Sequence, residues 1–336
     1  MNIYRHSRTR EKSADVSPPR RGNKTMKKNR ILGSVLLLIA SLIWGSAFVA
    51  QSLGMATIGP FTFTTIRVSL GALTLLPVCL VKDRFEKKKN PLREKRAFFT
   101  KRELFYGSMM GLAVFVAVNL QQFALAYTTA GKAAFITTLY IVFVPIAGVF
   151  MKKRVPLFVW FGVALAFVGL YLLCVSPTEG SVNIGDILAL CCSLFFTLQI
   201  LLIEKSGDET DGVKLSFLQF SVCGLLSIGM MFLFETPSID GIFAAALPLL
   251  YAGCLSGGVA YTLQIIGQKN LNTTMASLLM SLESVFAVLT AWLFMQEEMH
   301  TSEIIGCVIM FTAIVLALLA DGLSPKQHNE QKDKQT

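Results

Sequence analysis

Glu283 is the acidic residue that lies deepest in any apolar stretch of this chain, near the middle of the segment 273–295. A carboxylate at that depth is costly, about 2.5–3.5 kcal/mol even on lenient insertion scales, so it is retained for a reason. One reason is functional, a titratable or substrate-facing carboxylate. The other is structural, a carboxylate held by a cation or by hydroxyl groups of neighbouring helices. The sequence leaves both open, and Ser277, Ser281 and Ser284 make one side of the same predicted helix polar.

Two basic side chains also lie in or beside apolar stretches. Arg67 sits inside the stretch that begins at Phe61, and a guanidinium stays charged, so it must meet a carboxylate, backbone carbonyl groups or water. A structural anchor and an anion-binding group both satisfy that requirement. Lys132 lies at the edge of the stretch that begins at Ala133, where its long stem lets the ammonium group reach the interface. Substrate contact is therefore one of two interpretations of Lys132.

Uncharged polar residues form a second set inside the apolar stretches. Each alone is typical of a hydrogen bond between helices, which contributes about 0.6 kcal/mol on average. Their recurrence in corresponding parts of two halves favours a common polar cavity. They are Ser41, Trp44, Phe48 and Gln51 on one predicted helix face, then Asn119 with Gln122, Thr197 with Gln199, and Tyr261 with Gln264 and Gln268.

The sequence lacks the motifs of enzymes and ATP-driven pumps. There is no HExxH, Gly131-Lys132 lacks the other residues of a phosphate loop, and no second deep carboxylate accompanies Glu283 for acid–base hydrolysis. All seven cysteines fall in apolar stretches and none forms a CxxC pair, so we interpret them as buried thiols. The sequence therefore predicts a protein that is not an enzyme and that has no cofactor and no metal site.

Ten apolar stretches, each about twenty residues long, divide the chain, and about twenty residues are needed to cross a hydrocarbon core. If the N-terminus is inside, 29 of the 31 lysines and arginines fall in inside segments and none in the outside connections. Basic loops resist translocation, so this asymmetry predicts an even number of spans with both termini cytoplasmic. Orientation and anionic lipid explain the net charge of +10, and no nucleic-acid partner is expected. The stretches begin near Ile31, Phe61, Leu104, Ala133, Pro156, Gly185, Leu215, Ile242, Thr273 and Ser302.

An internal repeat is visible when the chain is displaced by 143 residues, because Leu120-Gln121 then falls on Leu263-Gln264 and Val142-Phe143 on Val285-Phe286. Two halves of five spans each enter the membrane in opposite senses, an architecture that recurs in transporters. The predicted fold is an all-α polytopic membrane protein with ten transmembrane helices as two inverted five-helix repeats. The expected divisions are a disordered basic arm (1–30), a first repeat (31–175), a second repeat (185–320) and a cytoplasmic tail (321–336).

Three segments together resemble the drug/metabolite transporter superfamily, in particular its EamA-type ten-span branch. Arg67 falls where that family carries an arginine in its second span, and the likeness covers about residues 27–321. The resemblance implies secondary transport, typically export, of small polar metabolites, with amino acids among them. The three segments are Leu42-Ile43-Trp44-Gly45-Ser46-Ala47-Phe48, then Tyr127-Thr128-Thr129-Ala130-Gly131-Lys132-Ala133-Ala134-Phe135 with Leu139-Tyr140, and Ser281-Leu282-Glu283 with Trp292-Leu293-Phe294 and Glu297.

The chain departs from the family at two prolines. Ile141 and Ser284 stand where such proteins often carry proline, directly after Tyr140 and Glu283. The departure leaves Pro145 to kink the fourth span and provides no proline for a matching hinge in the ninth.

The predicted function is a secondary transporter, specifically an exporter, of small polar metabolites such as amino acids, working by alternating access between the two repeats. Protons are a candidate coupling ion, a homodimer is a candidate assembly, and the predicted location is the bacterial plasma (inner) membrane. The alternative is a non-transporting membrane scaffold or sensor whose basic segment 82–103 binds a partner. The predicted substrate-binding or pathway residues are Trp44, Gln51, Asn119, Gln122, Lys132, Tyr140, Thr197, Tyr261, Gln264 and Glu283, with Arg67 as a structural or anion-binding charge.

Overall fold

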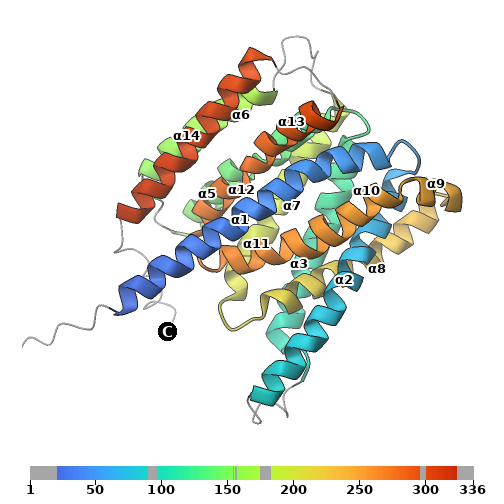
Figure 1. The fold of residues 1–336 in the computed structure, drawn as a ribbon, viewed down its shortest axis with the longest axis horizontal. Coiled ribbons are helices and arrows are strands. Elements are labelled where there is room, and N and C mark those ends of the chain that lie inside the picture. The colour runs from blue at the N-terminus through green and yellow to red at the C-terminus, as the bar shows by residue number, and fades with distance from the viewer. Residues whose placement is uncertain are drawn as a thin grey trace, which may run out of the picture.

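The computed structural model describes residues 21–89, 97–153, 155, 157–174, 183–295 and 300–323, and this part of the chain is a bundle of helices without a strand (Figure 1). Its elements are α1 (Arg21–Gly54), α2 (Pro60–Lys89), α3 (Lys101–Ala124), α4 (Ala130–Thr137), α5 (Tyr140–Phe150), α6 (Leu157–Cys174), α7 (Ile184–Ser206), α8 (Gly212–Phe234), α9 (Ile239–Ala244), α10 (Ala246–Leu250), the π-helix η2 (Tyr251–Ala260), α11 (Tyr261–Gln268), α12 (Thr273–Met280), α13 (Leu282–Met295) and α14 (Thr301–Leu323).

The predicted membrane architecture is confirmed. Eight segments of the described chain are long and apolar enough to cross a membrane. Helices α6 and α14 add the shorter apolar segments Leu157–Leu172 and Ile304–Leu316. With them the fold is the ten-span bundle of two inverted repeats, in which α1–α6 form the first half and α7–α14 the second.

The limits of the expected arm and tail need correction. Residues 21–30, expected in a disordered arm, form the first turns of α1. Arginine and lysine are good helix formers, and extending a helix that already exists is easier than starting one. The rest of the arm, residues 1–20, and most of the tail, residues 324–336, lie outside the described part of the chain.

Two carboxylates each cap a helix of the opposite half. Glu103, in the first turn of α3, accepts a hydrogen bond from Asp211 N at 2.9 Å, at the start of α8. Glu235, at the end of α8, accepts bonds from Phe61 N at 2.9 Å and from Thr62 N at 2.8 Å, at the start of α2. Since the first N–H groups of a helix have no partner within that helix, both carboxylates join the two halves.

Spans four and nine are interrupted at corresponding positions. Span four consists of α4 and α5 and breaks at residues 138–139, and span nine consists of α12 and α13 and breaks at Ser281. The break in span four precedes Pro145, which lies inside α5, so the expected kink at Pro145 stays a prediction. Hydroxyl groups at both breaks bond carbonyl groups of the preceding turn, Thr138 Oγ1 at 2.6 Å and Ser281 Oγ at 2.7 Å. Such bonds compete weakly with the helical pattern.

Close helix packing surrounds span eight, which consists of α9, α10, η2 and α11. A Cβ on Gly253 of η2 would lie 2.9 Å from Arg67 O of α2, so glycine is needed for that approach. A Cβ on Gly111 of α3 would likewise lie 2.9 Å from Gln219 O of α8. Helices α6 and α14 lie side by side at one edge of the bundle (Figure 1).

The two ends of the bundle are distinguished by the connections that lie there. The start of α1 lies beside the α11–α12 connection, because a Cβ on Gly33 would meet Asn270 Cβ at 2.9 Å. Lys269 of that connection bonds Thr210 between α7 and α8. We call this side of the bundle the basic face and the opposite side, where α1 ends, the far face.

Candidate substrate cavity

A narrow cavity lies in the middle of the bundle, where α1, α2, α3, α5, α7, α8, η2, α11, α12 and α13 meet. Its volume is about 50 Å³, which is room for a few water molecules. A metabolite therefore fits only after surrounding helices move apart. Seven of the predicted residues line this cavity, namely Trp44, Gln51, Arg67, Tyr140, Tyr261, Gln264 and Glu283.

Arg67 brings a buried positive charge to the cavity wall. Its guanidinium donates to the Gln51 side-chain oxygen and to Val118 O at 3.3 Å, and its Nε has no hydrogen-bond partner. The Phe63 ring centroid lies 6.0 Å from the guanidinium carbon. No carboxylate of the described residues lies within ion-pair distance of Arg67, so an amide and a carbonyl group hold it in place of a counter-charge.

Glu283 brings a buried carboxyl group to the same cavity, at the point where the two broken spans meet. Its Oε1 accepts hydrogen bonds from Tyr140 Oη at 3.1 Å and from Thr138 Oγ1 at 3.3 Å. Thr138 also bonds Ser284 at 2.6 Å. Hydroxyl groups of span four thus hold Glu283, and no cation of the described residues is paired with it. The displacement of 143 residues that relates the two halves places Tyr140 on Glu283, so the two partners are counterparts.

Amide and aromatic side chains also line the cavity. Gln199 and Gln264 exchange two hydrogen bonds of 3.1 Å, an amide pair between α7 and α11. The Tyr261 ring packs edge to face against Trp44, with 4.9 Å between ring centroids. Trp44 Nε1 is buried and has no hydrogen-bond partner in the described part of the chain, so it is an available donor beside the cavity.

Four predicted pathway residues are absent from the cavity lining. Asn119 donates to a carbonyl of its own helix at 2.7 Å, and Thr197 does so at 2.8 Å. Gln122 is fully buried, and neither of its side-chain polar atoms has a partner among the described residues. Lys132 forms an ion pair of 2.9 Å with Asp186 at the far face.

Gln121 and Gln199 line the cavity beside two of those residues. Gln199 was named in the polar set but not among the predicted pathway residues, and Gln121 was in neither group. The repeat carries a signal for Gln121, because the displacement of 143 residues superposes it on Gln264. For Gln199, the signal is its position two residues after Thr197 in the same predicted span. In both cases the sequence identified the helix and misjudged which of its faces lines the cavity.

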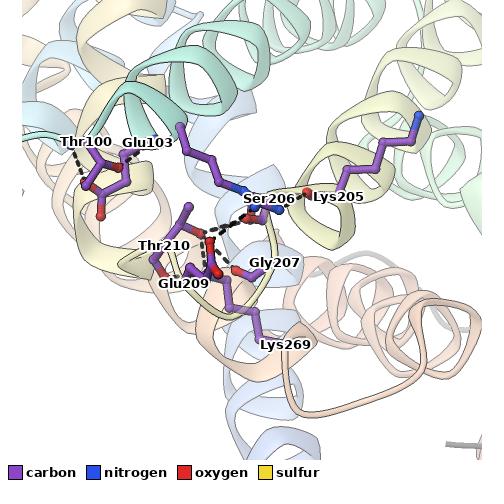
Figure 2. Close-up of polar contacts among 9 residues, drawn as sticks. Thr100, Glu103, Lys205, Ser206, Gly207, Glu209, Thr210 and Lys269 are labelled. Atoms are coloured by element: carbon purple, nitrogen blue, oxygen red, sulfur yellow. Dashed lines mark hydrogen bonds and ion pairs between the residues drawn. The ribbon is translucent and has the colours of Figure 1, made fainter. Parts of the chain in front are cut away.

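A network of hydrogen bonds and ion pairs surrounds the connection between α7 and α8 at the basic face. Lys269 Nζ donates to Thr210 O at 2.6 Å and to Thr210 Oγ1 at 2.8 Å, and Thr100 and Glu103 bond each other nearby (Figure 2). Lys82 pairs with Asp211 at 2.7 Å, across the two halves. Burial lowers the pKa of the Lys269 ammonium to about 8, although neighbouring carboxylates oppose the shift.

The described parts of the basic segment 82–103 bind this protein's own second half. Lys214 of α8 pairs with Asp83 at 2.8 Å and donates to Phe98 O at 2.5 Å, and Arg102 pairs with Glu209 at 3.3 Å. Residues 90–96 lie outside the described part. These contacts do not favour the alternative of a scaffold that offers the segment to a partner.

Comparison with known proteins decides the family. Residues 31–175 and 183–319 each match the EamA-like transporter family. The chain belongs to this family. An uncharacterized transporter of Archaeoglobus fulgidus is 30% identical over 296 residues, covering 86% of this chain and 87% of that protein. The uncharacterized transporter YoaV of Bacillus subtilis is 19% identical, covering 83% of this chain and 94% of that protein.

An EamA-like fold is also found among solved structures. One crystal structure superposes with a TM-score of 0.69 over 86% of this chain and 98% of the other, at 16% sequence identity. At that identity the likeness concerns the fold alone. The family match and the transporter relatives, together with the apolar helices, show that this EamA-like chain is an integral membrane transporter.

Proposed function

We propose that this EamA-like protein is a secondary transporter that exports small polar metabolites, with amino acids among them, by alternating access between its two repeats. The observation that carries the proposal is the buried Arg67, whose guanidinium has no counter-charge among the described residues. A buried permanent charge without a counter-charge is unfavourable, and an anionic group of a substrate supplies one.

Glu283 adds the second half of the recognition. It lines the same cavity, and hydroxyl groups hold it where a cation is missing. An α-amino acid places its carboxylate on Arg67 and its ammonium group on Glu283, and Trp44 Nε1 offers a further donor. This arrangement recognises both charges of a zwitterion, which explains why two opposite charges are kept in the hydrocarbon core.

Alternating access follows from the size of the cavity and from the inverted repeat. The cavity holds only a few water molecules, so loading and release need separate openings on the two faces. We assign the basic face to the cytoplasm, because basic segments resist translocation, and the membrane to the bacterial plasma membrane. Export is the direction that the family resemblance implies.

Counterflow in liposomes tests the proposal. The purified protein is reconstituted with unlabelled amino acids inside, and uptake of labelled amino acids, organic acids, amines and neutral metabolites is compared. We expect uptake of at least one zwitterion, at least tenfold lower activity in Arg67→Gln, and partial activity in Arg67→Lys. The matched control is Arg102→Gln, which removes a half-exposed arginine on the basic face and should transport normally. Transport restricted to amines or neutral metabolites overturns the assignment of Arg67.

Glu283→Gln separates coupling from binding. If a proton on Glu283 drives accumulation, the variant still exchanges substrate across the membrane and no longer accumulates it in response to a pH gradient. Unchanged pH dependence in this variant removes protons on Glu283 from the mechanism and leaves the transporter assignment standing.

A further inference from the structure

Helix α7 is tied to span four by an ion pair at each end. At the far face, Lys132 Nζ of α4 lies 2.9 Å from Asp186 Oδ2, in the first turn of α7. At the basic face, Lys153, just after α5, pairs with Glu204 in the last turn of α7. Span four belongs to the first half and α7 to the second, so both ion pairs cross between the halves.

The far-face pair is the better fixed of the two. Its side chains are 16% and 8% exposed, against 26% and 34% for Lys153 and Glu204. Asp186 Oδ2 also accepts a bond from Asn183 N at 3.1 Å, and its Oδ1 accepts one from Thr128 Oγ1 at 3.3 Å. A carboxylate held on three sides loses little freedom when Lys132 binds, and breaking a buried pair strands a charge. The more exposed pair is weakened by water.

The break at residues 138–139 separates these two attachments. The half-helix α4 carries Lys132 and α5 leads to Lys153, and a single tight turn at residues 138–139 joins them in place of regular α-helix. One half-helix can therefore leave α7 while the other stays attached. The break also holds the Tyr140–Glu283 contact, so a movement of either half-helix reaches the cavity directly.

Among the described residues, the counterpart helices of the second half form no such ion pairs. Helices α12 and α13 contain Glu283 as their only charged residue, and it lies in the cavity. They meet α1 through close packing at Gly45, where a Cβ would lie 2.6 Å from Glu283 O, and through a bond of 3.1 Å from Ser41 Oγ to Leu279 O. The two repeats share a fold and differ in how their broken spans are held.

We propose that each of the two ion pairs holds one membrane face of the transporter closed, and we call these pairs gate locks. Lys132–Asp186 keeps the far face closed through α4, and Lys153–Glu204 keeps the basic face closed through α5. The inference rests on the proposed transport function, and it assigns Lys132 a positioning role in place of substrate contact. Because the far-face lock is the more buried, the protein without substrate opens more readily to the basic face, the side from which an exporter loads.

Accessibility of the cavity to a reagent tests the locks without any substrate. A single cysteine replaces Ala47, which lines the cavity, in a background whose seven native cysteines are replaced by alanine. An impermeant maleimide is applied to either face in turn. We expect Lys132→Gln and Asp186→Asn each to raise the labelling rate from the far face by about tenfold, and to leave labelling from the basic face unchanged. Lys132→Arg, which keeps the charge, should label like the parent.

The basic-face lock gives the mirror result. Lys153→Gln and Glu204→Gln should each raise labelling from the basic face alone, by a smaller factor, and Lys153→Arg should not. The matched controls are Lys152→Gln, beside Lys153 on the basic face, and Asp240→Asn, in α9 on the far face. Both residues are exposed, and neither change should alter labelling.

The outcomes separate the lock proposal from the proposed function. Equal changes at both faces, no change in any charge-removing variant, or the same increase in the arginine variants would overturn the locks. Face-specific labelling in a protein that transports none of the tested metabolites keeps the locks and removes the proposed substrate class. Zwitterion transport in a protein whose labelling changes equally at both faces keeps the proposed function and rejects the locks.

Discussion

Replacing Glu235 by glutamine tests whether one carboxylate joins the two halves at the far face. Glu235 accepts hydrogen bonds of 2.6–2.9 Å from Phe61 N, Thr62 N and Thr62 Oγ1, at the start of α2. Glutamine keeps the size and one acceptor oxygen. Its NH2 group replaces the other oxygen and then faces an N–H group of α2, which is also a hydrogen-bond donor. The variant therefore loses one charge-assisted contact together with the attraction between the carboxylate and the helix N-terminus.

The expected loss follows from the number and exposure of these contacts. A hydrogen bond to a charged group contributes about 1.5–3 kcal/mol, and a carboxylate at a helix N-terminus adds about 0.3–1 kcal/mol. Glu235 is half-buried, so water weakens both contributions, and we expect Glu235→Gln to lower the free energy of unfolding by about 2 kcal/mol. For a chain of this length that loss corresponds to a fall in Tm of about 4 °C.

Thermal unfolding in detergent provides the measurement, with two companion variants. A Cβ on Gly59 would overlap the Glu235 carboxyl group, so Gly59→Ala displaces the same carboxylate, keeps its charge and should lower Tm by a similar amount. The double variant should be little worse than either single one, because both break one contact. Glu209→Gln is the control, since Glu209 is 81% exposed. An unchanged Tm in Glu235→Gln, or fully additive losses in the double variant, would refute the reasoning.

Three further outcomes are expected. Cysteine tags at Asp240 should react with an impermeant reagent applied outside the cell, and tags at Lys205 only after permeabilisation, because basic segments stay inside; the reverse pattern would overturn the orientation. Arg67→Ala should give less folded protein by size-exclusion chromatography than Arg67→Lys, since it leaves the buried Gln51 oxygen without its donor, and equal yields would contradict this. The pKa of Lys269 is about 8 in the folded protein and about 10.5 in the unfolded one. Burying its charged ammonium group therefore lowers the free energy of unfolding by the full amount below pH 8, and this loss disappears as the pH rises to 10.5. The Tm of the protein relative to Lys269→Met should therefore rise between pH 8 and 10, and a flat difference would exclude the shift.

The spans were predictable because the signals are local. An apolar run of the right length and a basic flank are visible without any knowledge of which helices touch. The same holds for Arg67 and Glu283, since a charge inside an apolar run is conspicuous whatever surrounds it. The partners of these charges were not predictable, because Gln51 and Tyr140 come from other spans.

The faces of the helices were harder to predict than their existence. A transmembrane helix is apolar around most of its circumference, so periodicity does not separate a lipid-facing side from a cavity-facing one. Asn119 and Gln122 share one side of α3, whereas the cavity receives Gln121, one residue away. The break at residues 138–139 was not predicted, because the sequence argument considered only proline as the cause of an irregular span and no proline stands there.

The contact between Tyr140 and Glu283 has a consequence for the origin of the chain. A residue near a two-fold axis meets its own copy when two identical subunits assemble. A symmetric dimer of one half would thus set tyrosine against tyrosine, or carboxylate against carboxylate, at this crossing. A phenol that donates to a carboxylate requires different residues at one position of the repeat, and only separately encoded halves can differ. Joining the two copies in a single polypeptide is therefore what made room for an unlike pair at the centre of the membrane.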